Sequence, residues 1–576
     1  MRSSGTARVA WTWPQRAIVA GYLAFGADFL YRTTFVVDGR VRFTLFDDAM
    51  ISMRYGENLA RGEGLAWNAH GPRVEGYSDF LWTLYMALVH LFTGRLDAPL
   101  VVEVTGLVLL ALTLAVVRAV ALEVAPQHPP VATVAMLLVA CSYSLLFWGG
   151  RGTEVSLVTL ETALAVLFAI RLRRGATTAG ALALGAVLAA AALTRDDAIV
   201  PVGVVVVWVA VTSAATIRVR MTVTTAVLPV LAIAGHEAFR RAYYGSWLAN
   251  TYYLKVTGIA LATRVHRGLD SVITLGSIEL WAPVTLVVAL LAMRRGRIGA
   301  DLGLLAAVVG GAVAYNIAVG GDAFEASELV NRFLCPAIPP LAVLAAVGLG
   351  ELAEARERRR ATAVALGAAA AIAISLRAAN ARPGHELQLG VLPAQWAPVR
   401  IGVPVVTAAV LLVLCLRADH RRFVLPLATV AVIASLCVKD LTGWVRYNAF
   451  VTDQIAGTRL GLALAASTTP DAVIAFDAAG APAYFSDRPA VDLGGKSDAV
   501  IARERPRIRE FVPGHDKFDY AYSLRTYHPD VVVALGATTA SDRALIASFG
   551  YEPLTSGLYV LRTTTRVDRA RLAAAL

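Results

Sequence analysis

Two adjacent carboxylates, Asp47 and Asp48, are the side chains of this chain best suited to acid–base chemistry. Neighbouring residues on a helix point about 100° apart, so one carboxylate can face a reactant while the other supports it. Ile51, Tyr55 and Leu59 follow at a spacing of four, which predicts an amphipathic helix at a membrane surface. A carboxylate near that surface, shielded from bulk water, is suited to act as general base toward a hydroxyl group.

The same two residues also fit a purely structural role. Asp is a favoured N-cap residue, so Asp47 can cap the predicted helix. An acidic residue in the first turn interacts favourably with the helix dipole, which suits Asp48. The motif alone leaves the catalytic and the structural interpretation open.

Polar side chains in other loops form a second group of candidates. Guanidinium and ammonium groups bind phosphate, and aromatic rings can cover a sugar face. The candidates for a phosphate-linked sugar are Arg195, Asn250, Tyr252, Tyr253, Lys255 and Arg332, and the candidates for an acceptor or a supporting role are Glu75, Glu154, Asp322 and His515. Taken singly, each fits a structural turn or an interfacial anchor at least as well.

The composition excludes most soluble classes of protein. Hydrophobic residues make up 57% of the 576 residues and charged residues 16%, against roughly 25% charged in a soluble domain. A soluble enzyme, a disordered chain and a disulfide-rich secreted scaffold are all excluded by this balance. The four cysteines lie in or beside apolar runs and are interpreted as small buried residues. The chain is predicted to be a polytopic membrane protein.

Thirteen apolar runs are long enough to be membrane spans, for which about 20 residues are needed. The predicted spans are 17–36, 99–123, 131–149, 154–171, 177–193, 197–214, 220–237, 272–293, 302–320, 335–352, 361–378, 400–416 and 423–439. The run from Phe80 to Phe92 is short and is predicted to lie at the interface. With that assignment every arginine cluster falls on the side of the N-terminus, so the positive-inside rule places the N-terminus in the cytoplasm and the C-terminus outside.

This topology divides the chain into two predicted domains. Residues 1–440 form a transmembrane domain with a first outer loop at 38–98, and residues 441–576 form a small extracytoplasmic α/β domain. The tail has strand-like runs at 472–476, 530–535 and 558–561, with a helix-compatible stretch at 541–549. The fold class is therefore mainly α, with about 13 transmembrane helices and a small C-terminal α/β domain.

Several basic residues fall on the predicted outer side, against the positive-inside trend. Arg195, Arg240, Arg241, Lys255 and Arg332 are the members of this group. An anionic ligand bound on the outer face would explain them. The formal charge of +11 is assigned to loop retention, so nucleic acid is not expected as a partner. No nucleotide-binding or zinc-protease motif occurs in a plausible context.

The stretch FDDAMISMRYGENLARGEGLAWNAHGPRVEGYSDFLW resembles the first outer loop of bacterial GT-C glycosyltransferases, which take a sugar from a polyprenyl phosphate carrier. The resemblance is strongest to the terminal arabinofuranosyltransferase group of the mycobacterial arabinan cell wall. Met50 stands where that group has an aromatic residue, and Asp79 where Asn is commoner. Further similar segments are LTRDD at 193–197, YYG at 243–245, NTYYLK at 250–255, GGD at 320–322 with the later Arg332–Phe333, DAAG at 477–480 and GHDK at 514–517.

The resemblance implies an inverting sugar transfer at the outer face of a bacterial plasma membrane. The implied donor is decaprenyl-phosphoryl arabinofuranose, and the implied acceptor is a cell-envelope polysaccharide held by the tail. Asp47 is the expected base and Asp48 its support, while Arg195, Lys255 and Arg332 neutralise the departing phosphate. Tyr252 and Tyr253 would line the sugar or lipid passage. Asp322 and Glu154 would orient hydroxyls or hold a divalent cation, and the residues leave open whether a metal is used.

Three alternatives remain at this stage. One is a different lipid-linked-sugar transferase, acting on mannose, aminoarabinose or a protein acceptor. Another is a transporter of a lipid-linked sugar, which should carry ionisable residues in the middle of its spans. Asp28 and Arg32 are the main such pair in the predicted spans, at a spacing that allows them to interact. The third is a non-enzymatic scaffold for envelope assembly.

Overall fold

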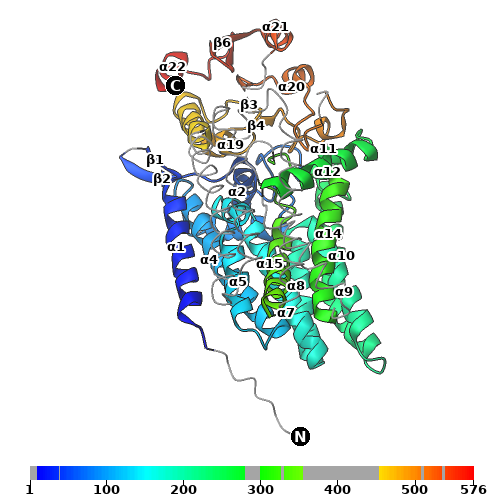
Figure 1. Cartoon of the computed structure of the whole chain (residues 1–576). Helices are drawn as coiled ribbons and strands as arrows, with labels where there is room; N and C mark the ends of the chain where they lie inside the picture. Colours follow the sequence, from blue (N-terminus) through cyan, green and yellow to red (C-terminus); the bar gives the residue numbers. More distant parts are fainter. Residues whose placement is uncertain are drawn as a thin grey trace.

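Long apolar helices run side by side through most of the chain in the computed structural model, and a sheet lies at one end of them (Figure 1). The structure describes residues 10–37, 39–278, 299–325, 330–354, 453–507, 511–534 and 539–576. The bundle contains α1 (Trp13–Tyr31), α4 (Ala98–Val124), α5 (Pro130–Ala140), α6 (Tyr143–Gly150), α7 (Val155–Arg174), α8 (Thr178–Thr194), α9 (Ile199–Thr212), α10 (Arg218–Tyr244), α14 (Ala300–Val319) and α15 (Ile338–Glu354).

Four helices of the described residues are long and apolar enough to cross a membrane, namely α4, α7, α10 and α14. The pair α5 and α6 meets the same criterion jointly but is bent by 57° at its break. The predicted span 131–149 is therefore two helices. The break falls at Ser142, whose backbone is extended (φ −76°, ψ 108°) and cannot continue the helix.

Other predicted boundaries also change. The end of the predicted first span is a strand, because α1 stops at Tyr31 and β1 (Thr34–Val37) pairs antiparallel with β2 (Arg40–Phe43). The run TFVV is rich in β-branched residues, which favour a strand over a helix end. The predicted loop 238–271 contains α11 (Asn250–Val256) and most of α12 (Leu261–Ile278). The predicted spans 361–378, 400–416 and 423–439, and most of 272–293, lie outside the described residues.

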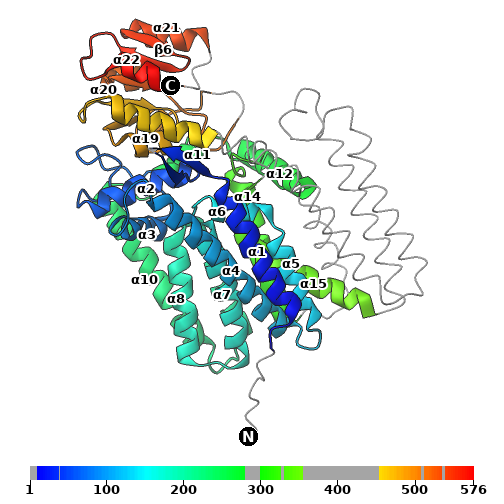
Figure 2. The same ribbon diagram turned by 90° about the vertical axis from the view of Figure 1, so that its left-hand side faces the viewer.

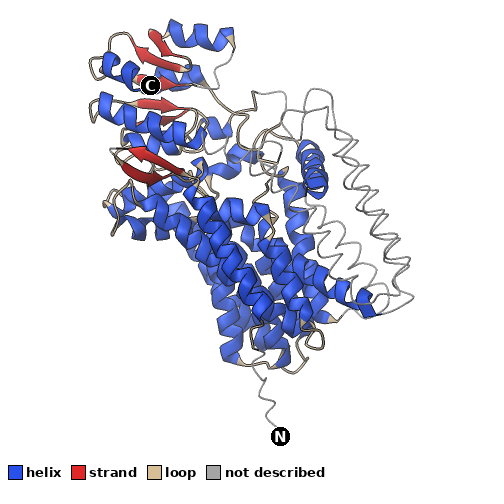
Figure 3. Ribbon diagram, turned by 60° about the vertical axis from the view of Figure 1, so that its left-hand side comes forward, coloured by secondary structure: helices blue, strands red, loops and turns tan. Residues whose placement is uncertain are grey.

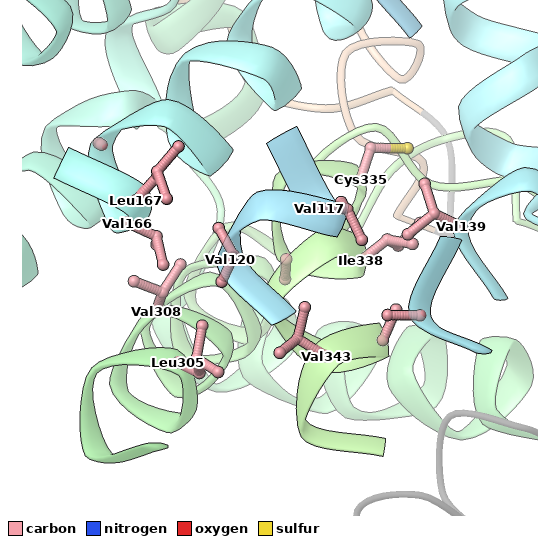
Figure 4. Close-up of a cluster of buried hydrophobic side chains, with 14 of the residues drawn as sticks. Val117, Val120, Val139, Val166, Leu167, Leu305, Val308, Cys335, Ile338 and Val343 are labelled. Atoms are coloured by element: carbon pink, nitrogen blue, oxygen red, sulfur yellow. The ribbon is translucent and has the colours of Figure 1, made fainter. Parts of the chain in front are cut away.

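The core of the bundle is built from Val, Leu and Ala (Figure 4). Val117 and Val120 of α4 pack with Val166 of α7, Leu305 of α14 and Val343 of α15, all 3% exposed or less. Cys335 is fully buried in the same cluster, as expected for a small apolar side chain, whereas Cys415 and Cys437 lie outside the described residues. The Asp28–Arg32 pair forms as predicted, at 3.1 Å.

The C-terminal residues form a five-stranded mixed sheet in the order β4-β3-β5-β7-β6. Its strands are β3 (Ile474–Phe476), β4 (Ala490–Asp492), β5 (Val531–Val533), β6 (Tyr551–Thr555) and β7 (Leu558–Leu561). β3 is parallel to β4 and β5, and β7 is antiparallel to β5 and β6. Strands β3, β5 and β7 lie within the three predicted runs. The helices around the sheet are α19 (Ala481–Ser486), α20 (Tyr520–Tyr527), α21 (Ala540–Ser548) and α22 (Arg569–Ala575), with a further helix at 453–467.

The period-two alternation of the strands connects this sheet to the first loop. Ile474 and Phe476 of β3 share a buried cluster with Tyr55 and Trp67, whereas the intervening Ala475 belongs to a second cluster with Leu524. One sheet face thus packs on the first loop and the other on α20 and α21. In both side views the strands lie at the end of the bundle opposite the start of α1 (Figures 2 and 3).

Two short helices of the first loop lie between the bundle and the sheet. α2 (Asp47–Ala60) confirms the predicted helix after the two carboxylates, and α3 (Phe80–His90) packs against it. With 11 residues α3 is about 16 Å long, shorter than the ~30 Å hydrocarbon layer. Helix α3 is therefore too short to cross that layer.

Helix contact within the bundle can be tested at Gly185 on α8. A Cβ added there would lie 2.8 Å from the backbone oxygen of Thr225 on α10. We expect Gly185→Ala to destabilise the protein by about 1 to 3 kcal/mol, as overpacking does, and to lower Tm in detergent. Gly303→Ala on α14 is the matched control, because a Cβ there meets no atom within 4 Å. An unchanged Tm for Gly185→Ala would contradict this helix packing.

Candidate functional site

Asp47 joins the first loop to the C-terminal sheet. Its carboxylate accepts hydrogen bonds from the backbone N–H groups of Gly480 (3.2 Å) and Ala481 (2.8 Å), at the start of α19. The N-cap of α2 itself is Phe46, so Asp47 is the first residue of its helix and does not cap it. Burial raises the pKa of Asp47 above its ordinary value, although Lys496 and the two N–H donors oppose the shift.

Asp48 lies between two cations that come from distant parts of the chain. Its carboxylate pairs with Arg332 at 2.9 Å and with the Nζ of Lys496. Burial disfavours the charged form, but Lys496 and Arg332 together outweigh it and hold the pKa of Asp48 well below its ordinary value. The two adjacent carboxylates thus have opposite environments, one bonded to neutral donors and one neutralised by cations.

The Arg332 guanidinium is fixed on every side. Asp322 accepts from its Nε at 3.0 Å and from its Nη2 at 3.2 Å, and also from its backbone N–H at 3.0 Å. The rings of Trp148 and Phe324 lie 4.9 and 5.5 Å from the guanidinium carbon. Burial of Asp322 raises its pKa, but the neighbouring Arg332 outweighs that effect and the net shift is downward. Two separate sequence candidates, Asp322 and Arg332, are therefore brought together at Asp48.

Among the described lysines, Lys255 is the one without a hydrogen-bond or ion-pair partner. Among the lysines that the structure describes, Lys496 pairs with Asp48 and Lys517 donates to three backbone carbonyls, whereas Lys255 has no hydrogen bond or ion pair. Its Nζ lies 5.4 Å from the ring centre of Phe333. Burial, followed by the nearby Arg332, lowers the pKa of Lys255 to about 8. A partly buried cation without a partner is costly, so a bound anion would be favourable at this position.

Arg195 lies on the other side of Phe333. Its guanidinium is 5.3 Å from that ring, donates to Glu154 at 2.8 Å and pairs with Asp197 at 2.7 and 2.8 Å. Two carboxylates therefore already neutralise it. Phe333 separates this paired cation from the unpaired Lys255.

The remaining candidates are distributed around this cluster. Glu75 is paired with Arg240 on α10 and is not at Asp48, and burial raises the pKa of Glu75 to about 7 despite that partner. Tyr252 is 47% exposed, and Tyr253 lies 4.0 Å from the Arg503 guanidinium. Asn250 donates to the backbone oxygens of residues 495, 496 and 498, at 2.9 to 3.1 Å. It thus holds the loop that carries Lys496.

His515 faces the same cluster from the C-terminal segment. Its ring lies 5.7 Å from Phe324, and its Nδ1 lies 3.2 Å from the carbonyl oxygen of Pro513. His515 is exposed as a residue, but the protein around it desolvates the imidazole and, with Lys496, lowers the pKa of His515 to about 4. His515 is therefore neutral at pH 7.

Parallel strands explain why the C-terminal residues converge here. The loops that follow β3 and β4 leave the sheet at the same edge, because the two strands are parallel. The loop after β3 contains Gly480 and Ala481, and the loop after β4 contains Lys496. Asp492, the last residue of β4, accepts from the backbone N–H groups of Gly494 (2.9 Å) and Gly495 (3.1 Å), which fixes the turn.

Lys496 and the aromatic rings beside Arg332 were not among the sequence candidates. A signal for Lys496 exists in the segment GGKS, since the chain has only four lysines and this one follows two glycines. Trp148 gave no signal, because it lies in an apolar run. Among the described residues, no group of three or more His, Cys, Asp or Glu side chains is placed to hold a metal ion.

Comparisons with known proteins agree with this architecture. Residues 446–570 match a family described as a domain of unknown function (DUF8728). None of the curated proteins matches the chain in sequence. The structure is similar to ArnT from Cupriavidus metallidurans bound to undecaprenyl phosphate, with a TM-score of 0.59, 16% identity and coverage of 96% of this chain and 98% of that chain. For apo ArnT the TM-score is 0.55 at 15% identity, covering 95% and 98%.

A third solved structure is archaeal oligosaccharyltransferase AglB from Archaeoglobus fulgidus, in complex with an inhibitory peptide and a dolichol-phosphate. Its TM-score is 0.49 at 10% identity, covering 96% of this chain and 75% of that chain. The likeness to ArnT over nearly the whole of both chains shows the fold. The described part of the chain is mainly helical, with apolar helices long enough to cross a membrane, and it has the fold of ArnT.

The contact between Asp47 and α19 can be tested at Gly480. A Cβ there would lie 1.9 Å from the backbone oxygen of Asp47, so Gly480→Ala must push α19 away from α2. We expect a lower Tm and faster tryptic release of the C-terminal segment. Gly457→Ala is the control, because its Cβ would meet Pro482 of the same α19 at an ordinary 3.6 Å. Equal protease resistance of the two variants would argue against the contact.

Proposed function

We propose that the protein transfers a sugar from a polyprenyl-phosphate donor to a hydroxyl group of a cell-envelope glycan. The observation that carries this proposal is the unpaired Lys255 beside Asp48, Arg332 and Lys496, with Asp47 next to them at the junction of bundle and sheet. A cationic group and a carboxylate base are the two parts that such a transfer needs. The fold shared with ArnT, solved with undecaprenyl phosphate, supports a lipid phosphate as the ligand.

Asp47 is the base in this proposal. A carboxylate has about four lone-pair sites, and two of those of Asp47 are used by the N–H groups of Gly480 and Ala481. The others can accept the proton of the acceptor hydroxyl. The acceptor oxygen then bonds to the anomeric carbon while the bond from that carbon to the phosphate oxygen breaks, and the anomeric configuration inverts. The raised pKa of Asp47 makes it a stronger base than Asp48.

Lys255 and Arg332 stabilise the leaving phosphate. The phosphodiester of the donor carries one negative charge, and Lys255 is the one ammonium in the described cluster without a carboxylate partner. Cleavage adds charge to the phosphate oxygen. Loss of one preorganised donor aimed at such developing charge typically costs about 3 to 4 kcal/mol. Asp48 divides its charge between Arg332 and Lys496 and so holds both in place.

The remaining candidates act around these groups. Glu154 and Asp322 hold the guanidinium groups of Arg195 and Arg332, and Asn250 holds the loop of Lys496. Tyr252 and Tyr253, on the same short helix as Lys255, line the approach of the donor. His515 and Glu75 lie on the side of the acceptor. Arabinofuranose is the sugar we favour, on the similarity of the first loop to the terminal arabinofuranosyltransferases.

Direct assay of sugar transfer tests the base. The purified protein in nanodiscs would be given synthetic polyprenyl-phosphoryl arabinofuranose and a short arabinan acceptor, with products followed by mass. We expect Asp47→Asn to lower kcat by ~100-fold or more, the range for a lost general base. Asp48→Asn should lower kcat and also raise the donor KM, because Arg332 and Lys496 both lose the carboxylate that holds them. Asp471→Asn, an exposed residue of the C-terminal segment, is the control.

The outcomes separate the alternatives. The native protein would also be given a panel of pentose and hexose lipids. Transfer from a different donor would support the transferase activity but replace arabinofuranose as the proposed sugar. Binding of the lipid without extension of any acceptor would overturn the enzymatic proposal in favour of transport. Full activity of Asp47→Asn would assign the base to another residue.

The unpaired lysine predicts a dependence on pH. Lysine is charged below its pKa, so with a pKa of about 8 the free protein loses this charge as pH rises through 8. We expect kcat/KM for the donor to fall above about pH 8, approaching tenfold per pH unit. Lys255→Arg should remove this alkaline limb, since guanidinium stays protonated. Profiles recorded between about pH 6 and about pH 10 check this, and an identical alkaline limb in Lys255→Arg would exclude Lys255 as its source.

A further inference from the structure

A buried ion pair lies behind the first turn of α2, on the side away from the sheet. Glu103 of α4 and Arg151, which follows α6, are both 0% exposed and lie 3.3 Å apart. Glu103 also accepts from the hydroxyl of Thr33 at 3.3 Å. Neither charge belongs to the cluster around Asp48. Two fully buried charges are costly to desolvate and are weak evidence for stability, so their presence calls for another role.

Arg151 contacts the backbone that leads into α2. Its Nη1 donates to the carbonyl oxygen of Thr44 at 2.9 Å, and its own carbonyl oxygen accepts from the backbone N–H of Phe46 at 3.0 Å. The segment 44–46 is thus held at two points by one residue. Asp47 and Asp48 are the next two residues, so their place in the site is set from behind by Arg151 and from the front by Gly480 and Ala481.

The guanidinium of Arg151 makes few hydrogen bonds. In the part of the chain that the structure describes, the buried Nε and Nη2 of Arg151 have no hydrogen-bond partner, so Nη1 alone makes its polar side-chain contacts. An arginine that connects several elements donates from all three of its nitrogens, as Arg54 does to four acceptors. Arg151 instead directs one N–H group at the carbonyl oxygen of Thr44, with Glu103 neutralising its charge.

We infer that the Glu103–Arg151 pair is a positioning element that fixes the register of segment 44–46 and thereby the carboxylate of Asp47. The inference rests on the proposed function for its catalytic consequence. Asp47 needs its two backbone donors on one side and a free lone pair toward the acceptor. A shift of the chain at Thr44 and Phe46 moves that carboxylate relative to Gly480 and Ala481, and so changes both its reach and its basicity.

The test removes both charges together. Breaking one partner leaves a buried unpaired charge and can unfold the protein, whereas replacing a buried pair by apolar residues of similar size is often neutral or stabilising. The double variant Glu103→Met/Arg151→Met therefore keeps the core filled but loses the donor to Thr44. We expect it to remain folded, with kcat lowered at least tenfold, an unchanged donor KM, and a shifted acid limb in the pH profile of kcat/KM.

A second readout does not depend on activity. Hydrogen exchange followed by mass spectrometry should show faster exchange of the peptide covering residues 44–50 in the double variant than in the native protein. Gly185→Ala is the control for general destabilisation, because it lies at the α8–α10 contact and should lower Tm without moving the acid limb or the exchange of that peptide. The single variant Arg151→Lys can still donate to the carbonyl oxygen of Thr44, so its kcat should be higher than that of the double variant.

The results distinguish this inference from the proposed function. Native kcat and native exchange of residues 44–50 in the double variant would overturn the positioning role. If residues 44–50 exchange faster in the double variant but the native protein transfers no sugar, the placement of Asp47 by Arg151 is upheld while the proposed function fails. If the acid limb of the kcat/KM profile shifts as much in Gly185→Ala as in the double variant, the pair is only a stabilising contact, and the inference is also overturned.

Discussion

The neutralisation of Asp48 is the interaction on which the rest of the site depends. A half-buried carboxylate at the start of a helix needs compensating charge, and Arg332 and Lys496 supply it from segments almost 300 and 450 residues further along the chain. The three groups can meet only if the first loop, the turn after α14 and the C-terminal sheet adopt one arrangement. The packing of the sheet on α2 and the binding of Arg332 by Asp322 are the conditions that make this possible.

The sheet meets these conditions through its parallel strands. Because β3 and β4 run in the same direction, their following loops reach the same edge and bring Gly480 and Lys496 to two adjacent carboxylates. The alternation of side chains along β3 then commits one face to Tyr55 and Trp67 of the first loop. Reversal of either strand would move one of the loops to the opposite edge and leave a carboxylate without its partner.

Local signals in the sequence predicted the parts of the site and not their pairing. The i, i+4 pattern after Asp48 predicted α2, and short apolar runs in the tail predicted the positions of β3, β5 and β7. The hairpin at the end of the first predicted span was missed, because the mostly apolar TFVV continues the apolar run of the helix before it. Lys496 was missed for a different reason, since its role arises from a contact across 448 positions of sequence. Asn250 was predicted to bind the donor on residue type, and the structure shows its amide used by three backbone carbonyls.

The adjacent carboxylates of Asp47 and Asp48 have different surroundings, although they have the same chemical structure. Rotation by about 100° along the helix turns Asp47 toward the backbone N–H groups of α19 and Asp48 toward two cations. Burial raises the pKa of Asp47 despite the opposing Lys496 and N–H donors, whereas the cations lower that of Asp48. The difference depends on the angle at which the chain enters α2, and that angle is fixed by backbone contacts at Thr44 and Phe46. A rotation there would turn both carboxylates away from their present partners, so a rigid entry into the helix is as necessary for the division of roles as the carboxylates themselves.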